Sequence, residues 1–159
     1  MRYLDPVVRG RLTDPTWEPR VKNSRVNRAD LAFEFVHQSW RADPTALRPI
    51  REEVDRWLIP LHLDPDTRED LVYAVSEAAT NAVEHAYRPP TESSTVELSF
   101  WTESATVYLE VVDHGSWKTP ASEVIERGRG IPMMQRLAES VLIHFDDRGT
   151  RVLLRHPLA

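Results

Sequence analysis

The sequence predicts an α+β domain, a two-layer sandwich in which helices cover one face of a mixed β-sheet. The spacing of its apolar residues predicts elements in the order strand, helix, helix, strand, strand, helix, strand, strand. This grouping of strands indicates such an architecture. The chain has 159 residues and a mass of 18.4 kDa, which fits one domain. Residues 1–28 contain three prolines and no helical or strand periodicity. We therefore expect an extended N-terminal arm over residues 1–28 and the domain over residues 29–159.

The first half of the domain is expected to hold one strand and two helices. Alternating apolar residues predict an opening strand over residues 31–40. Two Asp-Pro pairs predict helix starts, because aspartate caps a helix and proline is tolerated in its first turn. We expect these helices over residues 44–59 and 66–87, and a further proline pair stops the second one.

The second half is expected to hold a hairpin, a long loop, a short helix and two closing strands. The polar stretch over residues 114–129 has no periodicity, and a loop of that length in a compact domain is usually functional or disordered. A short turn at Glu103-Ser104 separates the two hairpin strands. The expected elements are strands over 96–100 and 106–112, a helix over 131–139, and strands over 141–145 and 150–154.

Composition and charge exclude several classes of protein. The chain has no cysteine, which excludes thiol catalysis, disulfides and cysteine-based zinc sites and favours a reducing, cytoplasmic location. No apolar run approaches the ~20 residues that span a bilayer, so we expect a soluble protein without a membrane segment. Residues 1–28 hold seven basic and three acidic residues, a net charge of +4, which leaves −9 for the rest of a chain whose total is −5. An acidic domain argues against direct nucleic-acid binding.

Three polar residues lie one turn apart along the second predicted helix. Glu77, Asn81 and His85 are spaced by four residues and form a ridge beside the apolar stripe that faces the sheet. An asparagine oxygen suits Mg²⁺, which takes its other ligands from water and phosphates. A neighbouring glutamate can orient or deprotonate a nucleophile. The same spacing also fits a solvated helix flank with a Glu-Asn hydrogen bond, so the ridge alone does not establish a site.

The glycines mark candidate ligand contacts. The chain has only five glycines, and four of them fall in its last third. Asp113 and Gly115 follow a predicted strand, where the carboxylate can accept a hydrogen bond from an exocyclic amine and the glycine gives room for a flat ring. Gly128 and Gly130 precede a predicted helix, whose first N–H groups form an anion site. Neither motif is specific alone, and the phosphate loop G-x-x-x-x-G-K-[ST] does not occur.

The order of these motifs is more specific than any one of them. A helix with Glu77 and Asn81 precedes the strand ending at Asp113, the long loop, the G-x-G segment and a final Gly-Thr pair. This order resembles the N, G1, G2 and G3 boxes of the Bergerat-fold ATPases, which include sensor histidine kinases, gyrase B, Hsp90 and MutL. The stretch over residues 76–87, with the string E-x-x-x-N-A-x-x-H-A-Y, is most similar to the anti-sigma factor serine kinases of bacteria. The resemblance extends over residues 31–154 and implies the Bergerat ATP-binding fold.

The resemblance implies a role for each matching residue, with ATP and Mg²⁺ as the bound groups. Glu77 would be the base for the acceptor serine, Asn81 the metal ligand that carries Mg²⁺, and Asp113 the partner of the adenine amine. Arg127 or Arg129 would stabilise charge on the transferring phosphoryl group, with Arg129 as the favoured catalytic residue unless it faces a partner. The other residues expected to contact the nucleotide are His85, Gly115, Arg127, Gly128, Gly130, Ile131 and Thr150, and residues 116–127 would form a lid.

The resemblance also implies partners. Members of this family hold a sigma factor and phosphorylate a serine of its antagonist, a STAS-domain anti-anti-sigma factor, and they commonly form homodimers. Trp17, Trp40 and Trp101 are candidate interface residues, with Trp40 favoured, although each fits the core as well. Trp117 stands where the family's G1 box often has a second glycine, so an altered nucleotide affinity is allowed for.

Other interpretations stay open from the sequence alone. A non-catalytic Bergerat module would bind nucleotide only as a structural ligand, but it would not need Glu77. The detached ATPase domain of a histidine kinase would need an upstream phospho-accepting helix pair, and residues 1–28 are too short and too rich in proline to form one. His85 fits a packed helix histidine as well as a mechanistic residue.

Overall fold

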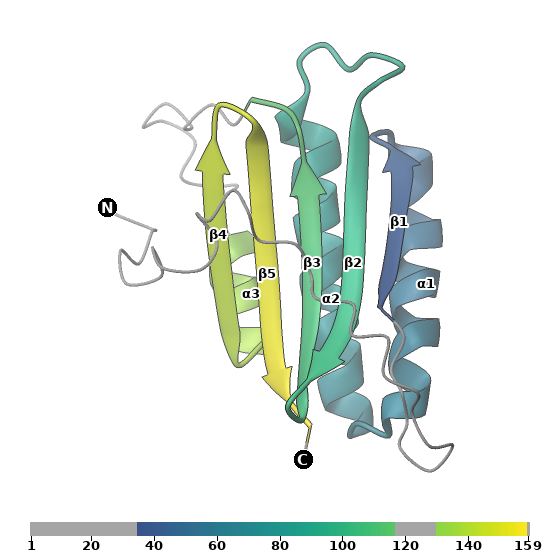
Figure 1. Ribbon diagram of the computed structural model, residues 1–159. Helices are drawn as coiled ribbons and strands as arrows, with labels where there is room; N and C mark the ends of the chain where they lie inside the picture. The colour runs from purple at the N-terminus through teal and green to yellow at the C-terminus, as the bar shows by residue number, and fades with distance from the viewer. Residues whose placement is uncertain (1–34, 117–129, 159) are drawn as a thin grey trace.

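The computed structural model describes residues 35–116 and 130–158, which form an α+β sandwich of two layers (Figure 1). The helices of these residues lie on one face of a five-stranded sheet with the strand order β1-β2-β3-β5-β4. The predicted fold class is therefore confirmed. The elements are β1 (Val36–Arg41), the 3₁₀ turn η2 (Pro44–Ala46), α1 (Leu47–Leu58), the 3₁₀ turn η3 (Ile59–Leu61), α2 (Pro65–Asn81), the π-helical turn η4 (Ala82–Ala86), β2 (Thr95–Glu103), β3 (Thr106–Asp113), α3 (Gly130–Leu137), β4 (Ser140–Asp146) and β5 (Gly149–Pro157).

One detail of the fold prediction is wrong, because the described sheet is antiparallel throughout rather than mixed. A strand, helix, strand unit such as β3, α3 and β4 can pair its two strands in parallel. Here β3 and β4 do run in the same direction, but β5 lies between them (Figure 1). Strand β5 pairs antiparallel with both neighbours, so no parallel pair forms among the described strands.

Both predicted helix starts are confirmed by side-chain caps. Asp43 Oδ1 accepts a hydrogen bond from Thr45 N at 2.8 Å. Asp64 Oδ2 accepts one from Thr67 N at 3.0 Å. Each carboxylate thereby satisfies a backbone N–H group that has no partner within its helix.

Across the described residues, none of the helices has the length and apolarity that a bilayer crossing requires.

The second helix ends differently from the prediction of one regular helix over residues 66–87. Helix α2 ends at Asn81, and the chain continues as the π-helical turn η4. Turns of this kind are underwound relative to an α-helix and occur frequently at functional sites. The change of winding therefore falls directly after one of the predicted site residues.

The core lies between the sheet and the three helices, and α2 contacts its centre through short side chains. Buried Ala74, Ala78 and Ala79 let α2 approach the strands closely. The indole of Trp57 lies on Phe100 of β2, with ring centroids 5.5 Å apart. The other large, fully buried core side chains are Ile50, Leu58, Leu71, Leu98, Leu109, Met134 and Leu154.

The end of α1 offers a direct test of this packing. Leu58 is fully buried, whereas its neighbour Ile59 is 52% exposed. Leu58→Ala should lower the free energy of unfolding by about 2–5 kcal/mol, because it leaves a cavity among packed side chains. Ile59→Ala, the matched control, should change it by about 0.5 kcal/mol or less. Urea unfolding followed by circular dichroism measures both, and equal losses would contradict the packing described here.

Candidate functional site

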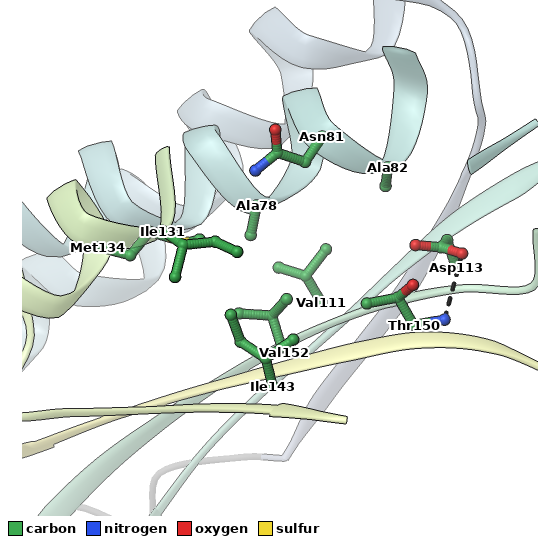
Figure 2. A pocket seen from close by; sticks show the side chains of 10 residues that line it. All are labelled: Ala78, Asn81, Ala82, Val111, Asp113, Ile131, Met134, Ile143, Thr150 and Val152. Carbon is green, nitrogen blue, oxygen red and sulfur yellow. Dashed lines mark hydrogen bonds between the residues drawn. The ribbon is translucent and has the colours of Figure 1, made fainter. Parts of the chain in front are cut away.

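A pocket lies between the helices and the sheet, with α2, η4 and α3 on one side and strand residues on the other (Figure 2). Ala78 and Ala82 face the pocket from the helical side, and their short side chains leave space above Val111. Asn81 contributes from the helical layer and Asp113 from the end of β3. The full lining consists of Ala78, Asn81, Ala82, Val111, Asp113, Ile131, Met134, Ile143, Thr150 and Val152.

Asp113 places a buried carboxyl group at one end of this pocket. The residue is 4% exposed, and its Oδ1 accepts a hydrogen bond from Gly115 N at 3.1 Å. It also accepts one from Thr150 N at 3.3 Å (Figure 2). Burial raises the pKa of Asp113 above its usual value, although these hydrogen bonds act in the opposite direction. The side chain is therefore held by two backbone N–H groups in a position to accept hydrogen bonds from a ligand.

Thr150 adds a second polar group beside this carboxyl. Its Oγ1 is buried and has no hydrogen-bond partner among the described residues. A buried hydroxyl without a partner is destabilising by about 1–3 kcal/mol, so a ligand that bonds to it would be favoured. The edge of an adenine ring carries an amine donor and nitrogen acceptors, which suit a carboxyl and a hydroxyl together. The hydrogen-bonding groups at this end of the pocket therefore match those on the edge of an adenine ring.

The turn that follows Asp113 is tied to the end of η4. Ser116 N donates a hydrogen bond to the carbonyl oxygen of Ala86 at 2.8 Å. A Cβ on Gly115 would lie 2.1 Å from that same oxygen, so only glycine allows the two backbones to come this close. The glycine expected to give room for a ligand ring thus also has a structural role.

Tyr87 is a residue of this region that the sequence reasoning missed. Its Oη donates a hydrogen bond to the carbonyl oxygen of Thr95 at 2.6 Å and accepts one from His114 N at 2.8 Å. The phenol therefore bridges the start of β2 and the turn after β3. The sequence did hold a signal for this role, because Tyr87 ends the motif over residues 76–87. The hydroxyl of a tyrosine beside a site usually forms a hydrogen bond.

Glu77 lies one turn before Asn81 and meets the start of α3. A Cβ on Gly130 would lie 2.1 Å from Glu77 Oε1, so a larger residue at the start of α3 would displace the carboxylate end of Glu77. The next residue, Ile131, lines the pocket. The predicted base and the pocket are therefore connected through the first two residues of α3.

The structure thus brings seven of the predicted site residues to one end of the domain, while His85 is directed elsewhere. His85 Nδ1 lies 3.3 Å from Nη2 of Arg88, and its Nε2 lies 3.8 Å from Glu84. His85 lies within the turn η4, beyond the end of α2, and it does not line the pocket. The seven residues at this end are Glu77, Asn81, Asp113, Gly115, Gly130, Ile131 and Thr150. The remaining candidates lie outside the described residues: Trp117, Arg127, Gly128 and Arg129. The expected lid also lies outside them, apart from Ser116.

The tryptophans proposed as interface residues have different surroundings. Trp40 is partly buried and packs against the core. Trp101 stacks on Tyr108, with ring centroids 5.1 Å apart and nearly parallel planes. Trp17 lies outside the described residues. Packing of Trp40 on the core does not test the expectation of a homodimer.

Comparisons with known proteins agree with this geometry. Residues 40–156 match the protein family described as the histidine kinase-like ATPase domain. The chain belongs to this family. The ATPase domain is 26% identical over 134 residues to the serine-protein kinase RsbW of Bacillus licheniformis, across 75% of this chain and 83% of that protein. The expected similarity to the serine kinases is therefore confirmed.

Solved structures show the same relationship. The RsbU and RsbW domains of Rv1364c from Mycobacterium tuberculosis match with a TM-score of 0.63 and 27% identity, over 79% of this chain. The ATPase domain spans only 32% of that longer chain. Two structures of a blue-light activated histidine kinase from Erythrobacter litoralis match at 19% identity with TM-scores of 0.54 and 0.52, covering 69% and 72% of this chain and 61% and 41% of theirs. At that identity they show a shared fold alone.

The raised pKa of Asp113 leads to a pH-dependent stability. Because the folded protein holds this proton more tightly than the unfolded chain, the stability contributed by Asp113 is lost as the pH rises from the unfolded to the folded pKa. Asp113→Asn keeps an acceptor oxygen for both N–H groups but cannot ionise. We expect the variant to gain stability relative to the native protein as the pH rises from acid to neutral, measured by urea midpoints across pH.

A matched control is Asp147→Asn, which removes an exposed carboxylate from the turn between β4 and β5. It accounts for any general effect of lowering the negative charge. A stability difference for Asp113→Asn that stays constant with pH, or that falls as the pH rises, would contradict the electrostatic description of this pocket.

Proposed function

We propose that this ATPase domain is an ATP-dependent protein serine kinase that acts as an anti-sigma factor. It binds a sigma factor, and it phosphorylates a serine of a STAS-type anti-anti-sigma protein, so that two partners compete for one kinase. The similarity to the serine-protein kinase RsbW supports this assignment. The observation that carries it is the contact of Glu77 with the start of α3, next to a pocket that Asn81 and Asp113 line.

Binding in this proposal uses residues from both layers. Asp113 accepts a hydrogen bond from the adenine amine, and the Thr150 hydroxyl donates one to a ring nitrogen. Asn81 is the protein ligand of Mg²⁺. The N–H groups at the start of α3, from Gly130 onward, face the phosphates. Bound ATP supplies the phosphoryl group, and Mg²⁺ offsets the negative charge of the phosphate oxygens.

Glu77 is the base of the proposed transfer. It accepts the proton of the serine hydroxyl while the serine oxygen forms its bond to the γ-phosphorus and the bond to the β,γ-bridging oxygen breaks. The products are phosphoserine, ADP and a protonated Glu77, which returns its proton to water. We also propose that Arg129 stabilises charge on the phosphoryl group during the transfer.

The proposal assigns the kinase activity to residues 29–159, with residues 1–28 as an arm outside the catalytic unit. It places the protein in the cytoplasm, where sigma factors act, and it includes a homodimer as the working form. The acidic domain fits partners that are proteins rather than nucleic acids.

Glu77→Gln separates binding from catalysis. The substitution keeps the shape of the side chain against Gly130 but removes the base, so ATP affinity should stay within about twofold while phosphotransfer falls by about 10²–10⁴-fold. Transfer of radiolabel from ATP to a STAS-domain protein of the same organism measures the rate. Glu84→Gln, at an exposed position of η4, is the control and should change neither quantity.

Two outcomes would count against the assignment. A native rate for Glu77→Gln would show that Glu77 is not the base. A native protein that binds ATP but transfers no label to any STAS-domain protein would favour the non-catalytic, nucleotide-dependent binding module instead.

Asn81→Ala tests the metal ligand. Loss of the amide oxygen should remove the dependence of ATP binding on Mg²⁺ and weaken binding overall. Titration with ATP in the presence and absence of Mg²⁺, followed by tryptophan fluorescence, measures both effects. The control is Thr80→Ala, whose hydroxyl is bound to the carbonyl oxygen of Ser76 at 2.8 Å. An unchanged response to Mg²⁺ in Asn81→Ala would refute its role.

A further inference from the structure

The sheet has a second face, which the described helices leave uncovered (Figure 1). We call it the outer face; it is formed by the residues that alternate with the core-facing ones along each strand. In β3, Leu109 and Val111 face the core, so Glu110 between them belongs to the outer face. The register places Glu110 opposite Ser99 of β2 and Leu153 of β5. These three residues are only 5%, 7% and 8% exposed, respectively.

Glu110 lies at the centre of this face, and one of its carboxylate oxygens is short of a hydrogen-bond donor. Its Oε1 is buried and has no hydrogen-bond partner among the described residues. The nearest described cation is Arg151, whose Nη1 lies 3.4 Å from Oε1. Nδ1 of His37 is placed 3.0 Å from Ser99 Oγ. Burial raises the pKa of Glu110, as expected for a carboxyl taken out of water without sufficient partners.

Aromatic rings lead from the N-terminal end of the described chain to this carboxyl. The ring of Phe35 lies 6.1 Å from that of Trp101, which stacks on Tyr108, two residues before Glu110 in β3. Phe35 is the first described residue. Residues 1–34 therefore join the domain at the edge of the outer face, beside its aromatic residues.

The length and the positive charge of residues 1–34 also allow them to reach and pair with Glu110. Glu110 lies two strands away from β1, on the order of 10 Å, because neighbouring strands are ~4.8 Å apart. Arg28 and Arg25 precede Phe35 by seven and ten residues, which span up to about 25–35 Å when extended. Residues 1–28 carry a net charge of +4. Attachment to Phe35 holds these cations at a high effective concentration beside the buried carboxyl.

We propose that residues 1–34 dock on the outer face of the sheet of their own chain, where Arg25 and Arg28 donate the hydrogen bonds that Oε1 of Glu110 lacks. The guanidinium group suits this role because it is always charged and donates to carboxylates in a fixed geometry. The apolar residues of the segment, such as Trp17 and Val26, then cover the aromatic rings. The site is separate from the pocket described above, which lies on the helix-covered face of the sheet.

The absence of cysteine from the chain allows a clean test on the full-length protein. A nitroxide attached to Ser24→Cys should broaden the amide signals of β3 and β5 around Glu110 more strongly than those of α1, which lies on the other side of the sheet. A mixture of labelled chains with unlabelled, isotope-enriched chains should show no broadening. Selective broadening in the mixture would identify a second copy as the occupant, and no selective broadening in either sample would show that the arm does not dock there; both results overturn the proposal.

Charge variants test the contact itself. Glu110→Gln, and the double variant Arg25→Gln with Arg28→Gln, should each reduce the broadening severalfold, and their combination should add little to either. The controls are Glu103→Gln, at the exposed end of β2, and Arg2→Gln with Arg9→Gln, far upstream in the arm. Preserved dispersion of core signals shows that each variant still folds. Native broadening in both test variants, or equal loss in the controls, would refute the pairing.

Discussion

The domain depends on how closely helix α2 and its π-helical extension lie on strand β3. Alanines on the buried side of the helix bring it near the strand, and the glycine at position 115 lets the turn after β3 contact the helix backbone directly. The same short side chains that permit this approach leave the pocket between the layers. A larger residue on either side would fill the space or separate the layers, so the packing that stabilises the fold also shapes the site.

Strand β3 carries two buried carboxyl groups that face in opposite directions. Asp113 lies at the end of the strand, held by backbone N–H groups and directed toward the pocket. Glu110, on the outer face, has an oxygen without a hydrogen-bond partner among the described residues. Burial raises both pKa values, but the surroundings differ. Two backbone N–H groups donate hydrogen bonds to Asp113, whereas Oε1 of Glu110 has only the Arg151 guanidinium near it, at 3.4 Å.

Local signals in the sequence predicted much of this arrangement. The Asp-Pro pairs located both helix starts, because capping depends on neighbouring residues, and the ordered motifs identified Asn81 and Asp113 before any contact was known. The position of β5 between β3 and β4 was not predictable in this way, since strand order is decided by pairing between distant residues. The turn η4 and the bridging hydroxyl of Tyr87 likewise depend on tertiary contacts.

The central position of β5 has a consequence for biosynthesis. This strand is the last to leave the ribosome among those described, yet it forms the only link between β4 and the rest of the described sheet. It also supplies Thr150 and Val152 to the pocket. A nascent chain that has emerged only through β4 has four strands but cannot assemble them into one sheet. Completion of the fold therefore waits for residues 149–157, and the pocket between the layers is finished in the same late step as the sheet.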